Sequence, residues 1–130
     1  MGRLILDTTV LVAAERGGTR LDRLIADDDD VAIAAITVAE LLVGVGLADG
    51  RRKQARQAFV DGVLAAIPVE PYDADTARAH ADLLVHARRS GTPRGAHDLL
   101  VAATALARRR AVVTADPGGF SGLPGVTLAG

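Results

Sequence analysis

The sequence predicts an α/β fold in which a central, mostly parallel sheet of four or five strands is flanked by helices. Short, uninterrupted apolar runs at residues 4–6 and 31–35 are typical of strands buried on both faces of a parallel sheet, and residues 111–114 are predicted as a further strand. Longer segments in which apolar residues recur at helical spacing separate these runs. Because 130 residues suit one domain with a substantial core, residues 1–130 are expected to form a single domain.

The remaining elements follow in chain order from apolar periodicity and turn signals. After a first helix at 8–14, a second is predicted at 19–27. The aspartates at 27–30 are interpreted as a solvated loop, because the spacing and turn glycine of an EF-hand are missing. The segment 38–48 is predicted to be a helix that is apolar on all faces and therefore buried. A helix at 51–67, a brief strand at 68–71 and a helix that is capped by Asp73 and ends near Gly91 are predicted next. A helix at 97–107, a turn at 116–119 and a last strand at 126–128 complete the chain.

Composition narrows the class of function. The chain contains no cysteine, which excludes disulfides, thiolate zinc sites and cysteine nucleophiles. Only three residues are aromatic, which argues against base recognition on aromatic platforms. Fourteen of the fifteen cationic residues are arginine, whose two donors match phosphate geometry. The basic run Arg51, Arg52, Lys53 and Arg56 is interpreted as a solvated helix face, with contact to phosphate as the alternative.

No membrane or export segment is expected. No apolar run reaches about 18 residues, the length needed to span a bilayer. The N-terminus lacks a basic segment before an apolar core, so no signal peptide is predicted. A cytoplasmic location is therefore expected.

Three acidic residues stand at the beginnings of predicted helices. Asp7 follows the first strand, where open α/β sheets place ligands, although it could equally cap the next helix. Glu40 is the lone charge in its apolar helix; with Thr37 it fits a capping box, but its carboxylate also needs a partner from elsewhere in the chain. Asp98 repeats this arrangement in the first turn of another apolar helix, where the helix dipole alone would stabilise it.

Further polar residues surround these acids in the sequence. Asp116 follows the strand at 111–114 and also fits a turn position. Arg94 and His97 flank Asp98 and are candidates for positioning a substrate or water, although ordinary loop roles are favoured for both.

Together these motifs resemble the PIN-domain nucleases, and among them the VapC toxins of bacterial toxin–antitoxin pairs. The resemblance rests on four segments in the family's order, which span nearly the whole chain: Leu-Asp-Thr-Thr-Val-Leu (6–11), Thr-Val-Ala-Glu-Leu-Leu-Val-Gly (37–44), His-Asp-Leu-Leu-Val-Ala-Ala-Thr-Ala (97–105) and Val-Thr-Ala-Asp (113–116). By this resemblance Asp7, Glu40 and Asp98 match the three acidic metal-site positions, and Thr9 matches the hydroxyl residue near the first of them. The fourth segment departs from the commoner form, which has asparagine in place of Asp116 and aspartate in place of Gly119.

The chemistry explains why such acids would share a cation. Two carboxylates about 5 Å apart repel each other by roughly 3 kcal/mol at an effective dielectric constant near 20. A divalent ion removes this repulsion, and oxygen ligands favour Mg²⁺, with Mn²⁺ as the alternative. Such an ion can activate water and stabilise the leaving oxygen in phosphodiester hydrolysis. Asp7 and Asp98 are the expected principal ligands, with Glu40 and Asp116 completing the site or positioning the attacking water.

The resemblance also implies substrate and partners. It implies an endoribonuclease that cuts RNA to leave a 5′-phosphate, a VapB-like antitoxin that inserts an arginine near the acidic site, and a homodimer. Two alternatives remain open: a PIN fold that has lost catalysis and serves as a scaffold, and a receiver-type phosphotransfer enzyme. The second is ranked last, because the only lysine is Lys53 and not a late one. A phosphatase of the Asp-x-Asp type is disfavoured by Thr9.

Overall fold

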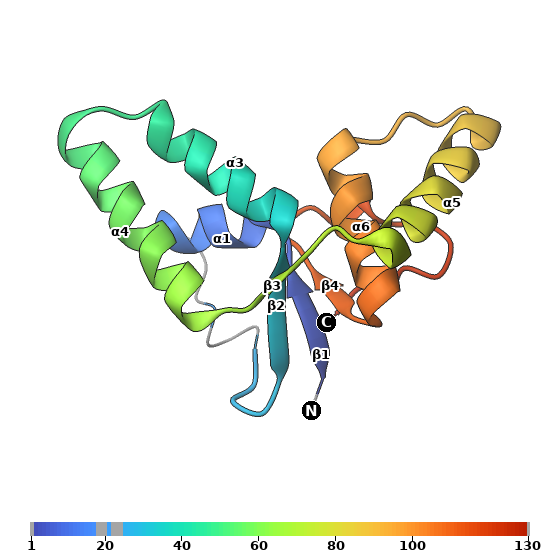
Figure 1. Ribbon diagram of the computed structural model, residues 1–130, viewed down its shortest axis with the longest axis horizontal. Coiled ribbons are helices and arrows are strands. Elements are labelled where there is room, and N and C mark those ends of the chain that lie inside the picture. Colours follow the sequence, from blue (N-terminus) through green and yellow to red (C-terminus); the bar gives the residue numbers. More distant parts are fainter. Residues whose placement is uncertain (1, 18–20, 22–24, 130) are drawn as a thin grey trace.

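The computed structural model describes residues 2–17, 21 and 25–129 and confirms the predicted fold class. Within this part of the chain, four parallel strands form one sheet in the order β3-β2-β1-β4 (Figure 1). The strands are β1 (Arg3–Leu6), β2 (Asp30–Ala34), β3 (Val69–Glu70) and β4 (Ala111–Val113). The helices are α1 (Thr8–Glu15), α3 (Ala35–Gly46), α4 (Gly50–Ala66), α5 (Ala74–Ser90) and α6 (Ala96–Arg108), with a short 3-10 turn, η1, at Pro117–Gly119.

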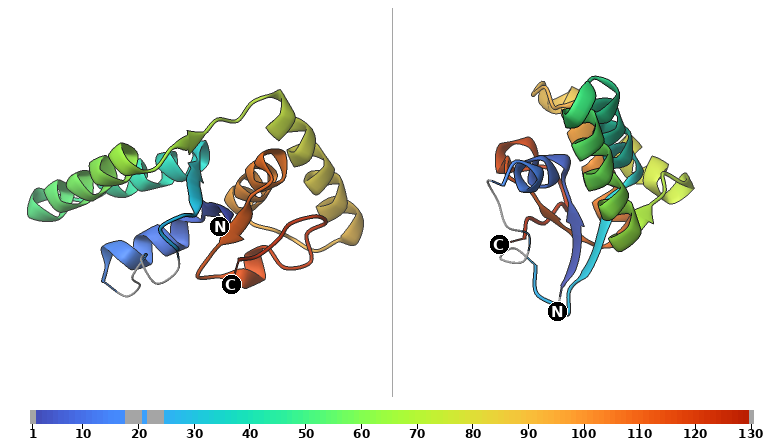
Figure 2. Two further views of the ribbon diagram at one scale, coloured as in Figure 1. Left: turned by 90° about the horizontal axis from the view of Figure 1, so that it is seen from below. Right: turned by 90° about the vertical axis from the view of Figure 1, so that its left-hand side faces the viewer.

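Both faces of the sheet are covered. Ile5 of β1 faces a cluster built with α5, α6 and Phe120, whereas Leu4 and Leu6 face a second cluster built with α1, α3 and α4. The figures show these two groups of helices on opposite sides of the sheet, with α3 and α4 projecting as one arm (Figures 1 and 2). Burial on both faces explains why the apolar triplet of β1 shows no alternation.

The strands end level with one another, which positions the polar residues that follow them. Leu6 pairs with Ile33 of β2 and with Val113 of β4, so these three strands end at the same edge of the sheet. Asp7 follows β1, Thr114 follows β4, and α3 begins directly after β2. The carboxyl edge of the sheet therefore gathers polar side chains from distant parts of the sequence.

Helix α3 corrects two predictions. It begins at Ala35, two residues before Thr37, with Ala34 as its N-cap and no side-chain capping bond, so the capping box of Thr37 and Glu40 is not formed. The helix is also not buried on all faces. Thr37, Leu41 and Val45 are buried, whereas Val43 is 58% exposed. Packing in the core of this chain therefore does not explain why the exposed face of α3 is also apolar.

Two further predictions were incomplete or wrong, and a third is untested. The aspartate run is not wholly a loop, because Asp30 lies in β2 and pairs with Arg3 and with the buried Arg110. Within the described residues, 126–128 form no strand, and Leu128 makes only an isolated bridge to Val112. The helix predicted at 19–27 falls largely outside the described residues. In the described part of the chain, no helix combines the length and apolar character needed to cross a membrane.

Candidate active site

Asp7 is buried at the carboxyl end of β1 and is held by three hydrogen bonds. The side chain is 3% exposed. Its Oδ1 accepts from the backbone N–H of Thr8 at 2.8 Å, so Asp7 does cap α1. Its Oδ2 accepts from the hydroxyls of Thr9 and Thr114, at 2.8 and 2.9 Å. The cap therefore uses one carboxylate oxygen, while two hydroxyl groups orient the other.

Glu40 finds the partners that the sequence predicted it would need. Its Oε1 accepts from the hydroxyl of Thr8 at 2.7 Å, and its Oε2 lies 2.9 Å from Nδ1 of His97. The hydroxyl of Thr8 also lies 3.3 Å from that of Thr37. These contacts join α1, α3 and the first turn of α6 at one point.

Asp98 packs closely against two glycines. An ideal Cβ at Gly119 would lie 2.6 Å from Oδ2 of Asp98, and one at Gly95 would lie 3.1 Å from the same oxygen. The pKa of Asp98 is raised above its usual value, first by desolvation and then by the negative charges of Asp7, Asp116 and Glu40, with His97 acting in the opposite direction. The other three carboxylates are thus near enough to act on Asp98 electrostatically.

Asp116 and Arg94 belong to the rim of this region. Asp116 is exposed, and its backbone N–H donates to the hydroxyl of Thr114 at 3.0 Å. The guanidinium of Arg94 donates to the carbonyls of Gly118 and Ser121, at 3.3 and 2.8 Å. Arg94 therefore ties the loop before α6 to the loop after β4, and its predicted contact with a substrate stays a prediction.

Three of the four predicted acids line one cavity. A cavity of about 380 Å³ is lined by Asp7, Glu40 and Asp98, together with Thr8 and Thr9; Asp116 is not part of its lining. Among residues 2–17, 21 and 25–129, no three acidic, histidine or cysteine side chains converge closely enough to hold an ion. The donor chemistry nevertheless fits Mg²⁺ or Mn²⁺, because the lining offers carboxylate and hydroxyl oxygens without thiols. The negative charges of Asp7, Asp116 and Glu40 repel a charged Asp98 carboxylate, and a bound divalent cation would offset this repulsion.

Sequence reasoning overlooked the residues that connect these acids. Thr8 bridges Asp7 and Glu40, and Thr114 orients Asp7, but neither was singled out. The available signal was a hydroxyl residue within two positions of the end of each of two strands that end at the same sheet edge. Arg16, which also lines the cavity, gave no sequence signal.

Comparison with known proteins agrees with this geometry. The model of the PIN domain family matches residues 4–125. Ribonuclease VapC5 of Mycobacterium tuberculosis is 37% identical over 86% of this chain and 82% of its own. The VapBC2 structure from Rickettsia felis, bound to a DNA fragment from its promoter, has a TM-score of 0.87 at 25% identity and covers 97% of this chain and 96% of that chain. The FitAcB structure from Neisseria gonorrhoeae has a TM-score of 0.84 at 31% identity, covering 98% of this chain and 96% of that one.

The matched region contains all four acidic positions and every strand of the sheet apart from Arg3, the first residue of β1. Fold, order of motifs and relatives point in one direction: the chain belongs to the PIN domain family, and within it to the VapC branch.

Proposed function

We propose that this protein is a divalent-metal-dependent endoribonuclease. The observation that carries the proposal is that Asp7, Glu40 and Asp98, from three elements far apart in the sequence, line one cavity at the carboxyl edge of the sheet. The name of the relative, Ribonuclease VapC5, supports RNA as the substrate.

In this proposal Asp7 and Asp98 are the principal ligands of Mg²⁺ or Mn²⁺, and Glu40 and Asp116 complete the site or position the attacking water. When bound, the ion supplies charge for a phosphodiester hydrolysis and activates water at neutral pH. Thr9 and Thr114 keep the Asp7 carboxylate oriented, while Thr8 and His97 orient Glu40. Such supporting hydrogen bonds hold a ligand set in place and tune its affinity.

The relatives also suggest the biological setting. We propose that the chain is the toxin of a type II toxin–antitoxin pair in the cytoplasm, because the similar VapBC-5 structure from Mycobacterium tuberculosis is described as a member of the VapBC family of toxin–antitoxin systems. A VapB-like antitoxin would neutralise it by placing an arginine near the carboxylates of the cavity. A homodimer is the proposed state of the toxin.

RNA cleavage by the purified protein tests the proposed function. We expect single-stranded RNA to be cut with Mg²⁺ or Mn²⁺ and to stay intact with EDTA. Asp98→Asn should abolish cleavage while the circular dichroism spectrum is retained, because the amide is isosteric with the carboxyl group. The matched control is Asp82→Asn, which alters an exposed aspartate of α5 and should cut at the wild-type rate.

Two results would contradict the proposal. One is RNA cleavage by Asp98→Asn at the wild-type rate. The other is a folded wild-type protein that cuts no RNA with either ion, which would favour a PIN-fold scaffold without catalysis. The altered fourth segment and the lack of three converging side chains within the described residues are the observations behind this second candidate.

A further inference from the structure

The acidic cavity continues into a groove between α1 and α4. A small cavity of about 150 Å³, lined in part by Val12, Arg16 and Glu40, shares these three residues with the acidic cavity. It shares Glu15, Arg16 and Arg56 with a further cavity of about 580 Å³. The groove formed by these three cavities therefore runs from the carboxylates to the surface between the two helices.

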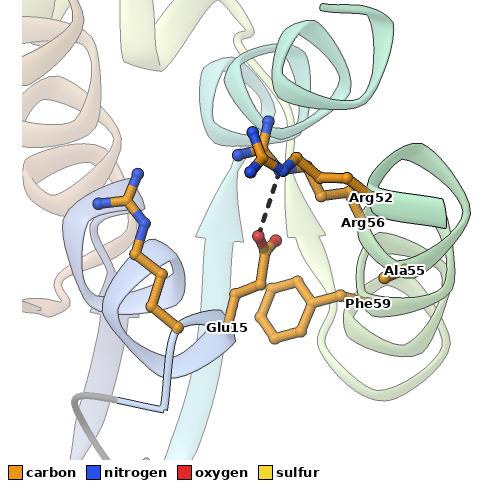
Figure 3. A pocket seen from close by; sticks show the side chains of 6 residues that line it. Glu15, Arg52, Ala55, Arg56 and Phe59 are labelled. Atoms are coloured by element: carbon orange, nitrogen blue, oxygen red, sulfur yellow. Dashed lines mark ion pairs between the residues drawn. The ribbon is translucent and has the colours of Figure 1, made fainter. Parts of the chain in front are cut away.

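The far end of this groove is basic. Its cavity is lined by Glu15, Arg16, Arg52, Ala55, Arg56 and Phe59. Figure 3 shows Arg52 and Arg56 reaching from α4 toward the same end of the cavity, and the ring of Phe59 facing α1. Carboxyl groups thus predominate at one end of the groove, where Arg16 is the one cation of the lining, and guanidinium groups predominate at the other, where Glu15 is the one acid.

The three arginines are not equivalent. The guanidinium of Arg56 lies 3.5 Å from the carboxylate of Glu15 and donates to the carbonyl of Gly44 at 3.0 Å, so Arg56 is already paired within the protein. Arg16 and Arg52 are exposed, and the guanidinium group of neither has a hydrogen-bond or ion-pair partner among the residues that the structure describes. Their donors are available to a ligand in the groove.

We propose that Arg16 and Arg52 bind a backbone phosphate of the RNA strand, away from the phosphate that is cut. This inference rests on the proposed nuclease function, since it assigns a second contact to the same substrate. The guanidinium group presents several donors in a fixed plane and matches the oxygens of a phosphate. Arg16 lines all three cavities, so a strand lying in the groove passes it on the way to Arg52.

Charge and spacing favour RNA over a peptide as the occupant. An RNA strand carries a phosphate at every nucleotide, so a strand anchored at the acidic end brings a phosphate to the basic end whatever its sequence. A peptide would need an acidic residue at one particular register. The partly buried ring of Phe59 gives the cavity an apolar wall, and proteins that bind single strands combine such walls with a basic groove.

The test measures RNA binding by the Asp98→Asn protein, in which the substrate stays intact. Anisotropy of a fluorescein-labelled single-stranded RNA of mixed sequence gives the affinity at several salt concentrations. With Arg16→Gln and Arg52→Gln combined, we expect affinity to fall about tenfold or more. The slope of log K against log salt should become shallower by about 0.7 for each phosphate that the protein no longer neutralises. Arg52→Lys, which keeps the charge but loses the planar set of donors, should keep the salt slope while the affinity falls.

The matched control is Arg51→Gln, which removes an exposed arginine from the same turn of α4 but outside the groove lining and should leave affinity and slope unchanged. In the cleaving protein, the double substitution should raise KM more than it lowers kcat. Unchanged affinity, salt slope and KM in a protein that still cuts RNA would overturn this inference alone, and would assign the basic cavity to a protein partner. A wild-type protein that cuts no RNA would instead overturn the proposed function.

Discussion

At the scale of single residues, Gly119 and Asp98 form one geometric unit. The commoner form of the family to which the sequence is similar has an aspartate at position 119, whereas here the carboxylate of Asp98 occupies the space that any side chain at 119 would need. The observed position of Asp98 therefore requires a glycine at position 119. The departure from the commoner sequence at Gly119 is thus linked to Asp98 in the third segment.

Gly119→Ala should displace Asp98 and reduce metal-dependent RNA cleavage by about 100-fold, because a shift of roughly 1 Å in a positioned group can cost that much. The added Cβ would lie 2.6 Å from Oδ2 of Asp98. Gly118→Ala is the matched control, since its Cβ would meet only Oδ1 of Asp116 at 3.5 Å, an ordinary contact. Equal cleavage rates for the two variants would show that Asp98 moves without consequence.

The raised pKa of Asp98 predicts a pH-dependent loss of stability in the metal-free protein. A carboxyl group whose pKa is higher in the folded than in the unfolded state favours folding when protonated, so its stabilising effect is complete below 3.8 and is lost as pH rises through the folded-state pKa. With EDTA present, wild-type Tm should therefore fall relative to that of Asp98→Asn as pH rises from about 3.8 toward neutrality. A constant difference between the two proteins would contradict the electrostatic account.

The sequence predicted the acids of this site better than their surroundings. Asp7, Glu40 and Asp98 were found because a lone acid in an apolar segment stands out, and the structure places all three around one cavity. Thr8 and Thr114 escaped because hydroxyl residues after strands are common and only the three-dimensional register pairs them with an acid. Contacts across 107 residues, such as Thr114 with Asp7, leave no local pattern.

At the scale of elements, most helix bounds follow from local signals, and the exceptions show what tertiary packing overrides. Asp73 and Gly91 enclose α5 as their cap preferences predict. Helix α3 instead starts at Ala35, because β2 runs directly into it and Thr37 and Glu40 are engaged by α1 and α6. A capping pattern therefore predicts a helix start only where the same side chains are not needed elsewhere.

The end of α6 provides a prediction about stability. Arg109 terminates this helix with φ 53°, and it is the only non-glycine residue with positive φ among the described residues. This left-handed conformation costs a residue with a Cβ about 1 kcal/mol, so Arg109→Gly should raise the free energy of unfolding by about 0.5–1 kcal/mol. Urea denaturation checks this, with Arg109→Ala as the control that removes the side chain but keeps the Cβ. A stabilisation that Arg109→Ala reproduces would assign the effect to charge instead.

At the scale of the whole molecule, an apolar surface on α3 has no cover among residues 2–17, 21 and 25–129. The exposed residues of α3 recur at helical spacing and form the α3 stripe: Ala35, Ala39, Leu42, Val43 and Gly46. At the base of the stripe, Ala35 and Ala39 line an apolar cavity of about 370 Å³ with Tyr72 and Leu100. A helix that is apolar all round in sequence but packed on one side in the structure has a second face to bury, which is the physical reason to expect a partner there.

A second copy of this chain is the partner that the proposed homodimer supplies. Light scattering should give the wild-type protein twice the 13.4 kDa mass of one chain, whereas Val43→Glu should shift it toward the mass of a single chain. Val43 is 58% exposed, so the substituted monomer keeps its core, but a carboxylate at the centre of the stripe would be buried without a partner in the dimer. Val85→Glu, on an exposed position of α5, is the matched control and should leave the dimer intact. Two results would contradict α3 as the dimer surface: a wild-type mass of one chain at micromolar concentration, or equal dissociation of both variants. Either result would show that burial of the α3 stripe does not hold two copies together.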